Sequence, residues 1–191
     1  MRYQPQHKEQ THRRIVQSAA RQFRAEGMNG PGVAKLMKAS GLTHGGFYKH
    51  FSSKDDLFAE AIDQAAREIG AQLTDWAKQA PPGECWKEIV QRYLSIEHCE
   101  NPGWGCPIAA LAPDIARTRA ATRKKIRKTM ETYKQQLLQF MPGDNPGEKQ
   151  KNFVLIFTAM VGAMTVARTL STREEKENLL GLVRNHLLTS F

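Results

Sequence analysis

Cysteine and long apolar runs are scarce in this chain of 191 residues. Its three cysteines (Cys85, Cys99 and Cys106) are odd in number and irregularly spaced, which argues against a disulfide framework and favours the reducing cytoplasm. The longest apolar run, residues 153–167, is shorter than the about 20 residues of a membrane span, so we expect a helix buried on two sides and no membrane partner. No apolar run follows the polar N-terminus, so we expect no signal peptide.

Patterns typical of catalysis and metal binding are also missing. The cysteines lack C-x-x-C spacing, no His-x-x-x-His pair occurs, and no glycine-rich loop follows a strand. The carboxylates of Glu60, Asp63 and Asp114 have the positions of ordinary helix-surface residues. We therefore expect no enzyme activity, no metal and no cofactor, with a helical enzyme lacking any recognisable motif as a disfavoured alternative.

Acidic residues are nearly absent from the first quarter of the sequence. Residues 1–54 carry ten Lys/Arg against two acids, Glu9 and Glu26, and so hold +8 of the whole-chain net charge of +9. A region of one sign is typical of a protein that binds a polyanion such as nucleic acid. A basic surface that serves only solubility, or one that lies on a membrane, would not explain the glycine-rich motif within this region.

Strand-type alternation is absent and helix-forming residues dominate, so we predict an all-α protein of nine helices. Pro31 is expected in the first turn of the second helix, and Pro113 is expected to end or kink the sixth. The predicted helices cover residues 8–25, 31–40, 43–50, 53–80, 84–99, 107–117, 120–140, 149–170 and 174–188.

Residues 41–58, GLTHGGFYKHFSSKDDLF, combine a helix stop, a turn and two new helix starts. Gly41 suits the left-handed position after a helix, and the hydroxyls of Thr43 and Ser53 are predicted to cap the following helices. Phe47 and Phe51 are expected in the core. This arrangement is typical of a helix-turn-helix unit that reads DNA.

Residues 13–58 resemble the TetR family of transcriptional repressors, through the ordered set G-L-T-x-G-x-F-Y-x-H-F-x-S-K-x-x-L. The resemblance implies an N-terminal three-helix helix-turn-helix domain, residues 1–52, and a C-terminal helical ligand-binding and dimerisation domain, residues 53–191. One departure is Gly30-Pro31-Gly32, where the family usually opens the second helix with Thr or Ser, so a phosphate-contacting hydroxyl is expected to be missing there.

The motif also supplies candidate contacts to double-stranded operator DNA. His44 and Gly45 are expected at base edges in the major groove, whereas Tyr48, His50 and Lys54 resemble the phosphate contacts of the family. The full set of expected DNA-binding residues is Thr43, His44, Gly45, Gly46, Tyr48, Lys49, His50 and Lys54.

The remaining two thirds of the chain give weaker predictions. We expect a homodimer that binds a pseudo-palindromic operator and is released by a small-molecule effector, whose identity the sequence does not specify. Candidate pocket residues, of types that more often belong to a plain core, are Trp86, Tyr93, His98, Trp104, Cys106, Met130, Tyr133 and Phe157. Candidate dimer-interface residues are Val154, Val161, Gly162, Leu179, Val183 and Leu187.

Two further features leave alternatives open. The Trp104-Gly-Cys-Pro107 segment places Cys106 at a predicted helix start, which is typical of a reactive thiol, and Cys99 would then be its resolving partner. The alternative function is therefore a redox- or electrophile-sensing repressor. The basic run Arg117–Lys128 is predicted to be a solvated face or, as the alternative, to attract an anionic effector.

Overall fold

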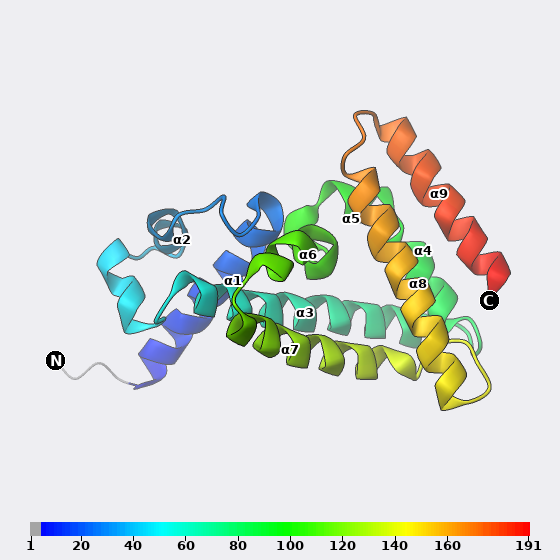
Figure 1. Cartoon of the computed structure of the whole chain (residues 1–191), viewed down its shortest axis with the longest axis horizontal. Coiled ribbons are helices and arrows are strands. Elements are labelled where there is room, and N and C mark those ends of the chain that lie inside the picture. The colour runs from blue at the N-terminus through cyan, green and yellow to red at the C-terminus, as the bar shows by residue number, and fades with distance from the viewer. Residues whose placement is uncertain (1–4) are drawn as a thin grey trace.

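The computed structural model describes residues 5–191, and within them it contains nine α-helices, two short 3-10 helices and no strand (Figure 1). The prediction of an all-α protein is therefore confirmed. In chain order the elements are α1 (Pro5–Glu26), α2 (Val33–Ala39), η1 (His44–Lys49), α3 (Lys54–Gln79), α4 (Cys85–Tyr93), α5 (Ile96–Glu100), η2 (Pro102–Trp104), α6 (Pro107–Arg117), α7 (Ala120–Leu138), α8 (Pro146–Ala167) and α9 (Arg173–Ser190).

Several helix boundaries differ from those predicted. The helix expected over residues 84–99 is interrupted after Tyr93, and α5 starts afresh because the Ser95 hydroxyl accepts a hydrogen bond from the backbone N–H of His98 at 3.3 Å. Pro113 does not end α6, which continues through it to Arg117. Pro31 lies before α2, whose N-cap is Gly32.

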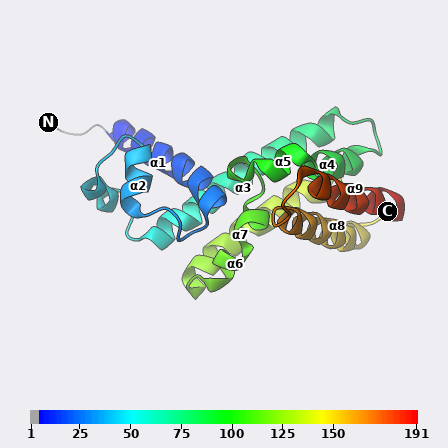
Figure 2. The ribbon, with the colours of Figure 1, turned by 90° about the horizontal axis from the view of Figure 1, so that it is seen from above.

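Two separate hydrophobic cores meet along α3. One half of the helix, from Leu57 to Ala65, belongs to a core shared with α1, α2 and η1. From Ile69 onward its buried residues join a second core shared with α4 to α9. Figures 1 and 2 show the result: α1 and α2 lie around one end of α3, α8 and α9 lie towards the other end, and α7 runs alongside it.

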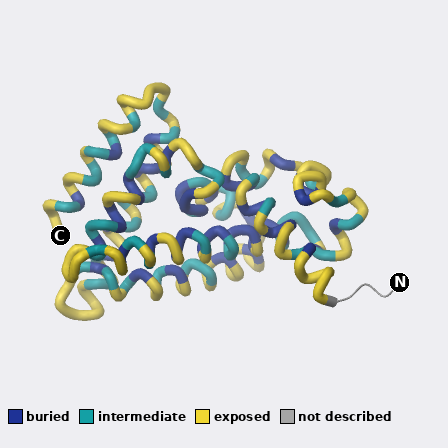
Figure 3. The backbone as a smooth tube through the Cα atoms, turned by 180° about the vertical axis from the view of Figure 1, so that it is seen from behind, coloured by how far each residue is buried: buried dark blue, intermediate teal, exposed yellow. Residues whose placement is uncertain are grey.

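Helices α8 and α9 leave apolar side chains uncovered. The residues of α8 on one face, such as Ile156 and Met164, are buried, but Val154 and Val166 are about half exposed and Leu182 on α9 is 73% exposed. The expectation that residues 153–167 are buried on two sides is therefore wrong for the single chain, and Figure 3 shows exposed stretches along both helices. By length and composition α8 is the one helix among the described residues that could cross a membrane, which is weak evidence because core helices of soluble proteins pass the same test.

Candidate nucleic-acid interface

The turn between α2 and η1 is built by backbone hydrogen bonds. Gly41 has a φ of +69°, and its N–H donates to the carbonyl of Lys38 at 2.9 Å. The N–H of Leu42 donates to the carbonyl of Met37 at 2.9 Å. This pair of bonds is the Schellman motif, which satisfies the last carbonyls of a helix and requires a residue that tolerates positive φ. The predicted role of Gly41 is thus confirmed.

The segment expected to read DNA forms the 3-10 helix η1 rather than a longer α-helix. Thr43 occupies its N-cap, but the hydroxyl makes no capping hydrogen bond, so the predicted cap is wrong and this hydroxyl is left for other partners. Phe47 is 1% exposed and Phe51 3% exposed, which confirms both as core residues. Tyr48, in contrast, is 70% exposed. The helix therefore turns one side to the core and presents the other to solvent.

Gly45 marks the most open position on that solvent side. A Cβ atom placed there would meet nothing within 4 Å, and the residue is not among those with positive φ. Neither packing nor backbone conformation within the chain therefore requires glycine. A bare backbone at an exposed helix start is suited to the close approach of a partner molecule. His44, adjacent to it, is exposed as well.

A groove of about 540 Å³ runs beside η1, between it and α1, and is lined by Lys8, Thr11, Leu42, Thr43, Gly46, Lys49 and His50. The sequence had not marked Lys8 or Thr11, although Lys8 belongs to the same basic region. Burial, together with the nearby charges of His12, Lys8 and Lys49, lowers the pKa of His50, which favours the neutral imidazole. The groove therefore owes its positive charge to the two lysines.

The basic charge of the first quarter divides into two groups. Arg24 is fully buried and donates to Glu68 Oε2 at 3.0 Å, while Arg13 pairs with Glu9 and Lys35 with Glu26. The second group makes no ion pair with any described carboxylate and lies exposed; it comprises Lys8, Arg14, Arg21, Lys38 and Lys49.

Lys54 belongs to neither group. Its ammonium lies 6.0 Å from the ring centroid of Phe23, and partial burial lowers its pKa. Of the three expected phosphate contacts, Tyr48 is exposed, whereas His50 and Lys54 are partly buried.

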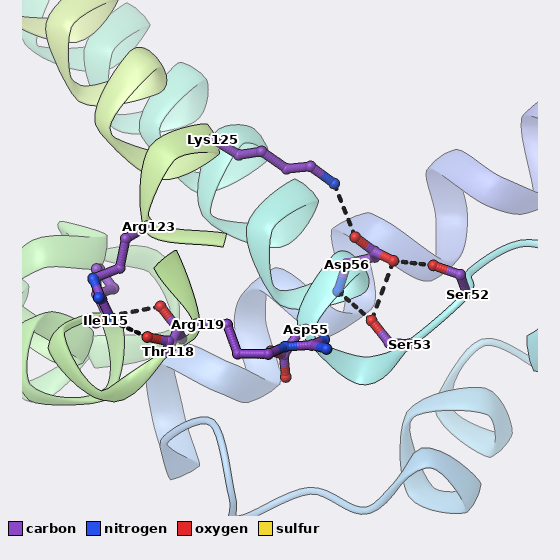
Figure 4. Close-up of polar contacts among 9 residues, drawn as sticks. All are labelled: Ser52, Ser53, Asp55, Asp56, Ile115, Thr118, Arg119, Arg123 and Lys125. Carbon is purple, nitrogen blue, oxygen red and sulfur yellow. Dashed lines mark hydrogen bonds and ion pairs between the residues drawn. The ribbon is translucent and has the colours of Figure 1, made fainter. Parts of the chain in front are cut away.

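A polar cluster holds the start of α3, directly behind η1, against α7 (Figure 4). The Ser53 hydroxyl accepts the backbone N–H of Asp56 at 3.1 Å, which confirms the predicted cap. The Asp56 carboxylate accepts from Lys125 at 2.9 Å and from Ser52, and these bonds lower its pKa to about 2. Asp55 pairs with Arg119 at 2.8 Å. The chain that leads out of η1 is therefore fixed to the start of α7.

The candidate pocket residues do not line one common cavity. Trp86, Tyr93, Cys106 and Tyr133 are buried in the second core, and the hydroxyls of both tyrosines have no hydrogen-bond partner among the described residues. The others are placed differently: Met130 and Phe157 are partly buried at the edge of the core, Trp104 is 58% exposed beneath the guanidinium of Arg21, and His98 shares a surface cleft of about 500 Å³ with Trp104.

His98 has both ring nitrogens engaged. Nδ1 donates to the carbonyl of Tyr93 at 2.7 Å, and Nε2 accepts the backbone N–H of Cys106 at 3.0 Å. Burial lowers the pKa of His98 to about 4, so it is neutral. Cys106 is the N-cap of α6 as predicted, but it is completely buried and its side chain makes no capping bond. Cys99 is also buried, and burial raises its pKa.

The candidate interface residues on α8 and α9 differ in exposure. Val154 and Gly162 are exposed, and a Cβ atom at Gly162 would meet nothing within 4 Å. Val161, Leu179 and Val183 are partly buried against the second core, whereas Leu187 lies inside it.

Comparison with known proteins gives one consistent picture. Residues 15–61 match the family described as "Bacterial regulatory proteins, tetR family". The transcriptional regulator AcrR of Shigella flexneri is 30% identical over 91 residues, which are 47% of this chain and 42% of that protein. The regulator LmrA of Bacillus subtilis is 26% identical over 105 residues, 54% of this chain and 56% of that protein. The chain thus matches about half the length of these relatives.

The fold extends the likeness beyond the matched segment. A TetR-family regulator from Cytophaga hutchinsonii superposes with a TM-score of 0.75 over 95% of both chains, at 20% sequence identity. The α4–α9 half, which lies outside the residues 15–61 that match the family, therefore has the same architecture as well.

Proposed function

Because the chain belongs to the TetR family of bacterial regulatory proteins, we propose that it is a ligand-responsive repressor that binds a pseudo-palindromic operator as a homodimer. The main support for this proposal is the exposed face of η1, where Gly45 has no side chain, next to a groove lined by Lys8 and Lys49. In this proposal residues 1–52 bind DNA and residues 53–191 bind the effector and the second subunit in the cytoplasm.

The exposed apolar face of α8 and α9 supports the homodimer. Val154, Val166 and Leu182 would lose contact with water if two helices from each subunit packed together. Gly162 leaves open space for a close helix approach. A two-fold axis would place the two η1 segments on successive major grooves, about 34–36 Å apart.

Burial of Cys106 and Cys99 favours a small-molecule effector over the redox alternative, since reactive cysteines are usually partly exposed. An effector in the second core would act on DNA binding by shifting α3, because that helix begins five residues after η1 ends and runs through both cores. A coupling of about 1–3 kcal/mol would suffice for regulation.

Fluorescence anisotropy with the DNA upstream of the protein's own gene tests the repressor proposal. We expect sequence-selective binding that weakens by orders of magnitude as salt rises. Lys49→Ala and Tyr48→Ala are expected to weaken binding to all sequences alike, whereas His44→Ala should relax preference at one base pair by about 1–3 kcal/mol. Lys151→Ala on α8 is the matched control. Equal affinity for the upstream DNA and for unrelated DNA would refute the proposal. So would η1 variants that bind DNA as tightly as the Lys151→Ala control.

A further inference from the structure

A cleft outside the candidate pocket lies where the DNA-binding helix α1 meets the C-terminal helices. Its volume is about 500 Å³, within the range of about 300–1,000 Å³ that small-molecule sites occupy. The walls come from α1, from the α5–η2 segment, from α6 and from the ends of α8 and α9; they include Arg24, Cys99, Glu100, Ala109, Arg168 and Lys176.

Arg168 at the end of α8 carries a charge with no counterion. Its Nε donates to the carbonyl of Cys99 at 3.2 Å and its Nη2 to the carbonyl of His98 at 3.1 Å. Nη1 is buried without a hydrogen-bond partner, and no described carboxylate forms an ion pair with Arg168. Burial lowers the pKa of this guanidinium, which shows the cost of removing it from water. Buried charges in proteins are normally paired.

The other charged groups of the cleft leave the positive excess in place. Lys176 makes no side-chain ion pair with a described residue, although it is close enough to Cys99 to lower the pKa of that thiol against the larger effect of burial. Glu100 is bonded to Arg173 at 3.5 Å, and Arg24 is matched by Glu68. Two cations, Arg168 and Lys176, therefore line one cavity without an ion pair to any described carboxylate.

We propose that this cleft binds a small organic anion through a carboxylate or phosphate group held by Arg168 and Lys176, with Ala109 and neighbouring apolar groups covering its carbon skeleton. A guanidinium and an ammonium are the side chains that proteins use for such groups, and hydrogen bonds between ions are about twice as strong as neutral ones. A purely structural role for Arg168 is the competing explanation, because its two bonds cap the last carbonyls of α5. That role leaves Nη1 and Lys176 unexplained.

Calorimetric titration of the purified chain, without DNA, tests the site. Sodium phosphate and sodium glutarate serve as separate probes, each at constant ionic strength set with sodium chloride. Wild type and the exposed-lysine control Lys151→Met are expected to bind at least one probe saturably, and the probe that binds identifies the head group. Lys176→Met should bind about tenfold more weakly, as the loss of one charge-assisted bond implies.

Arg168→Gln keeps a donor for the carbonyls of α5 and is expected to abolish binding, with thermal melting as the check on folding. If Arg168→Gln does not fold, Lys176→Met decides. The proposal would be overturned if neither probe binds the wild type beyond the chloride control. It would also be overturned if wild type and Lys176→Met bind with equal affinity.

Occupancy of the cleft should also change operator affinity, a consequence that rests on the proposed function. Arg24 of α1 lines the cleft and donates to the carbonyl of Gly105, so the cleft contacts the DNA-binding unit directly. Operator titrations with and without the bound probe, at fixed ionic strength, measure this. Because the calorimetry needs no DNA, a failure of anion binding and a failure of operator binding are told apart.

Discussion

Replacing Asp56 by Asn should loosen the start of α3 from α7. The bonds from Lys125 and Ser52 lower the Asp56 pKa from 3.8 to about 2, which corresponds to at most about 2.5 kcal/mol of stabilisation. The side chain of Asp56 is 31% exposed and that of Lys125 is 63% exposed, so solvent screens much of this. We expect a loss of about 1 kcal/mol, or about 2–4 °C in melting temperature for a chain of this length.

Thermal melting followed by circular dichroism measures this difference at several pH values. Because the folded-state pKa is depressed, the stabilisation is complete above pH 4 and is lost as pH falls from 4 towards 2. The gap between wild type and Asp56→Asn should therefore close over that interval, and also in 1 M salt. Asp75→Asn, an exposed position on the same helix, should leave the melting temperature unchanged. Equal melting of wild type and Asp56→Asn at pH 7 would refute the reasoning.

Three further substitutions test the packing at the C-terminal ends of α1 and α2 and in the loop before α6. Arg24→Met should lower the free energy of unfolding by about 3 kcal/mol in urea denaturation, because it removes the fully buried guanidinium with its ion pair to the partly buried Glu68 and its bonds to the carbonyls of Ala20 and Gly105; a loss below about 1 kcal/mol would contradict this. Gly41→Ala should cost about 1 kcal/mol because of the positive φ, whereas Gly32→Ala, with open space around it, should not. Gly105→Ala should cost about 1–3 kcal/mol by the same assay, since its Cβ would lie 2.4 Å from His98 Nε2; an unchanged midpoint would show that the loop adjusts freely.

Features governed by neighbouring residues were predictable from the sequence. The stop at Gly41 and the cap at Ser53 need only backbone conformation and a hydroxyl three residues before an N–H, so local sequence determines them. Thr43 has the same side-chain chemistry, yet its hydroxyl is not used, because η1 is a 3-10 helix with a different relation between cap and first turn. The break in the helix after Tyr93 was not predicted, because no glycine or proline marks it in the sequence.

Features that depend on where a side chain points were not predictable. Trp86 and Trp104 were equivalent candidates in the sequence, but one is buried in the second core and the other lies exposed over α1. Arg24 was counted with the basic surface, although its guanidinium is buried against Glu68. The net charge of a region can still be predicted, because the exposed lysines outnumber the one buried arginine. Individual side-chain contacts cannot be predicted, since each depends on how helices distant in the chain pack together.

Two of the connections between the halves of the molecule, helix α3 and the bond from Arg24 to Gly105, differ in mechanical character. Helix α3 spans 26 residues, about 39 Å, and its buried side chains pack in both cores. The helix can therefore transmit a displacement only if one of the two cores repacks. The bond from Arg24 to Gly105 joins α1 to the segment before α6, where Arg21 of α1 also lies over the ring of Trp104 and Pro102 borders the anion cleft. This segment packs mainly on α1, whereas α3 packs on α1, α4 and α7, so a ligand that shifts the segment breaks fewer contacts than one that moves α3. The segment is therefore the less costly route from the C-terminal helices to the DNA-binding surface.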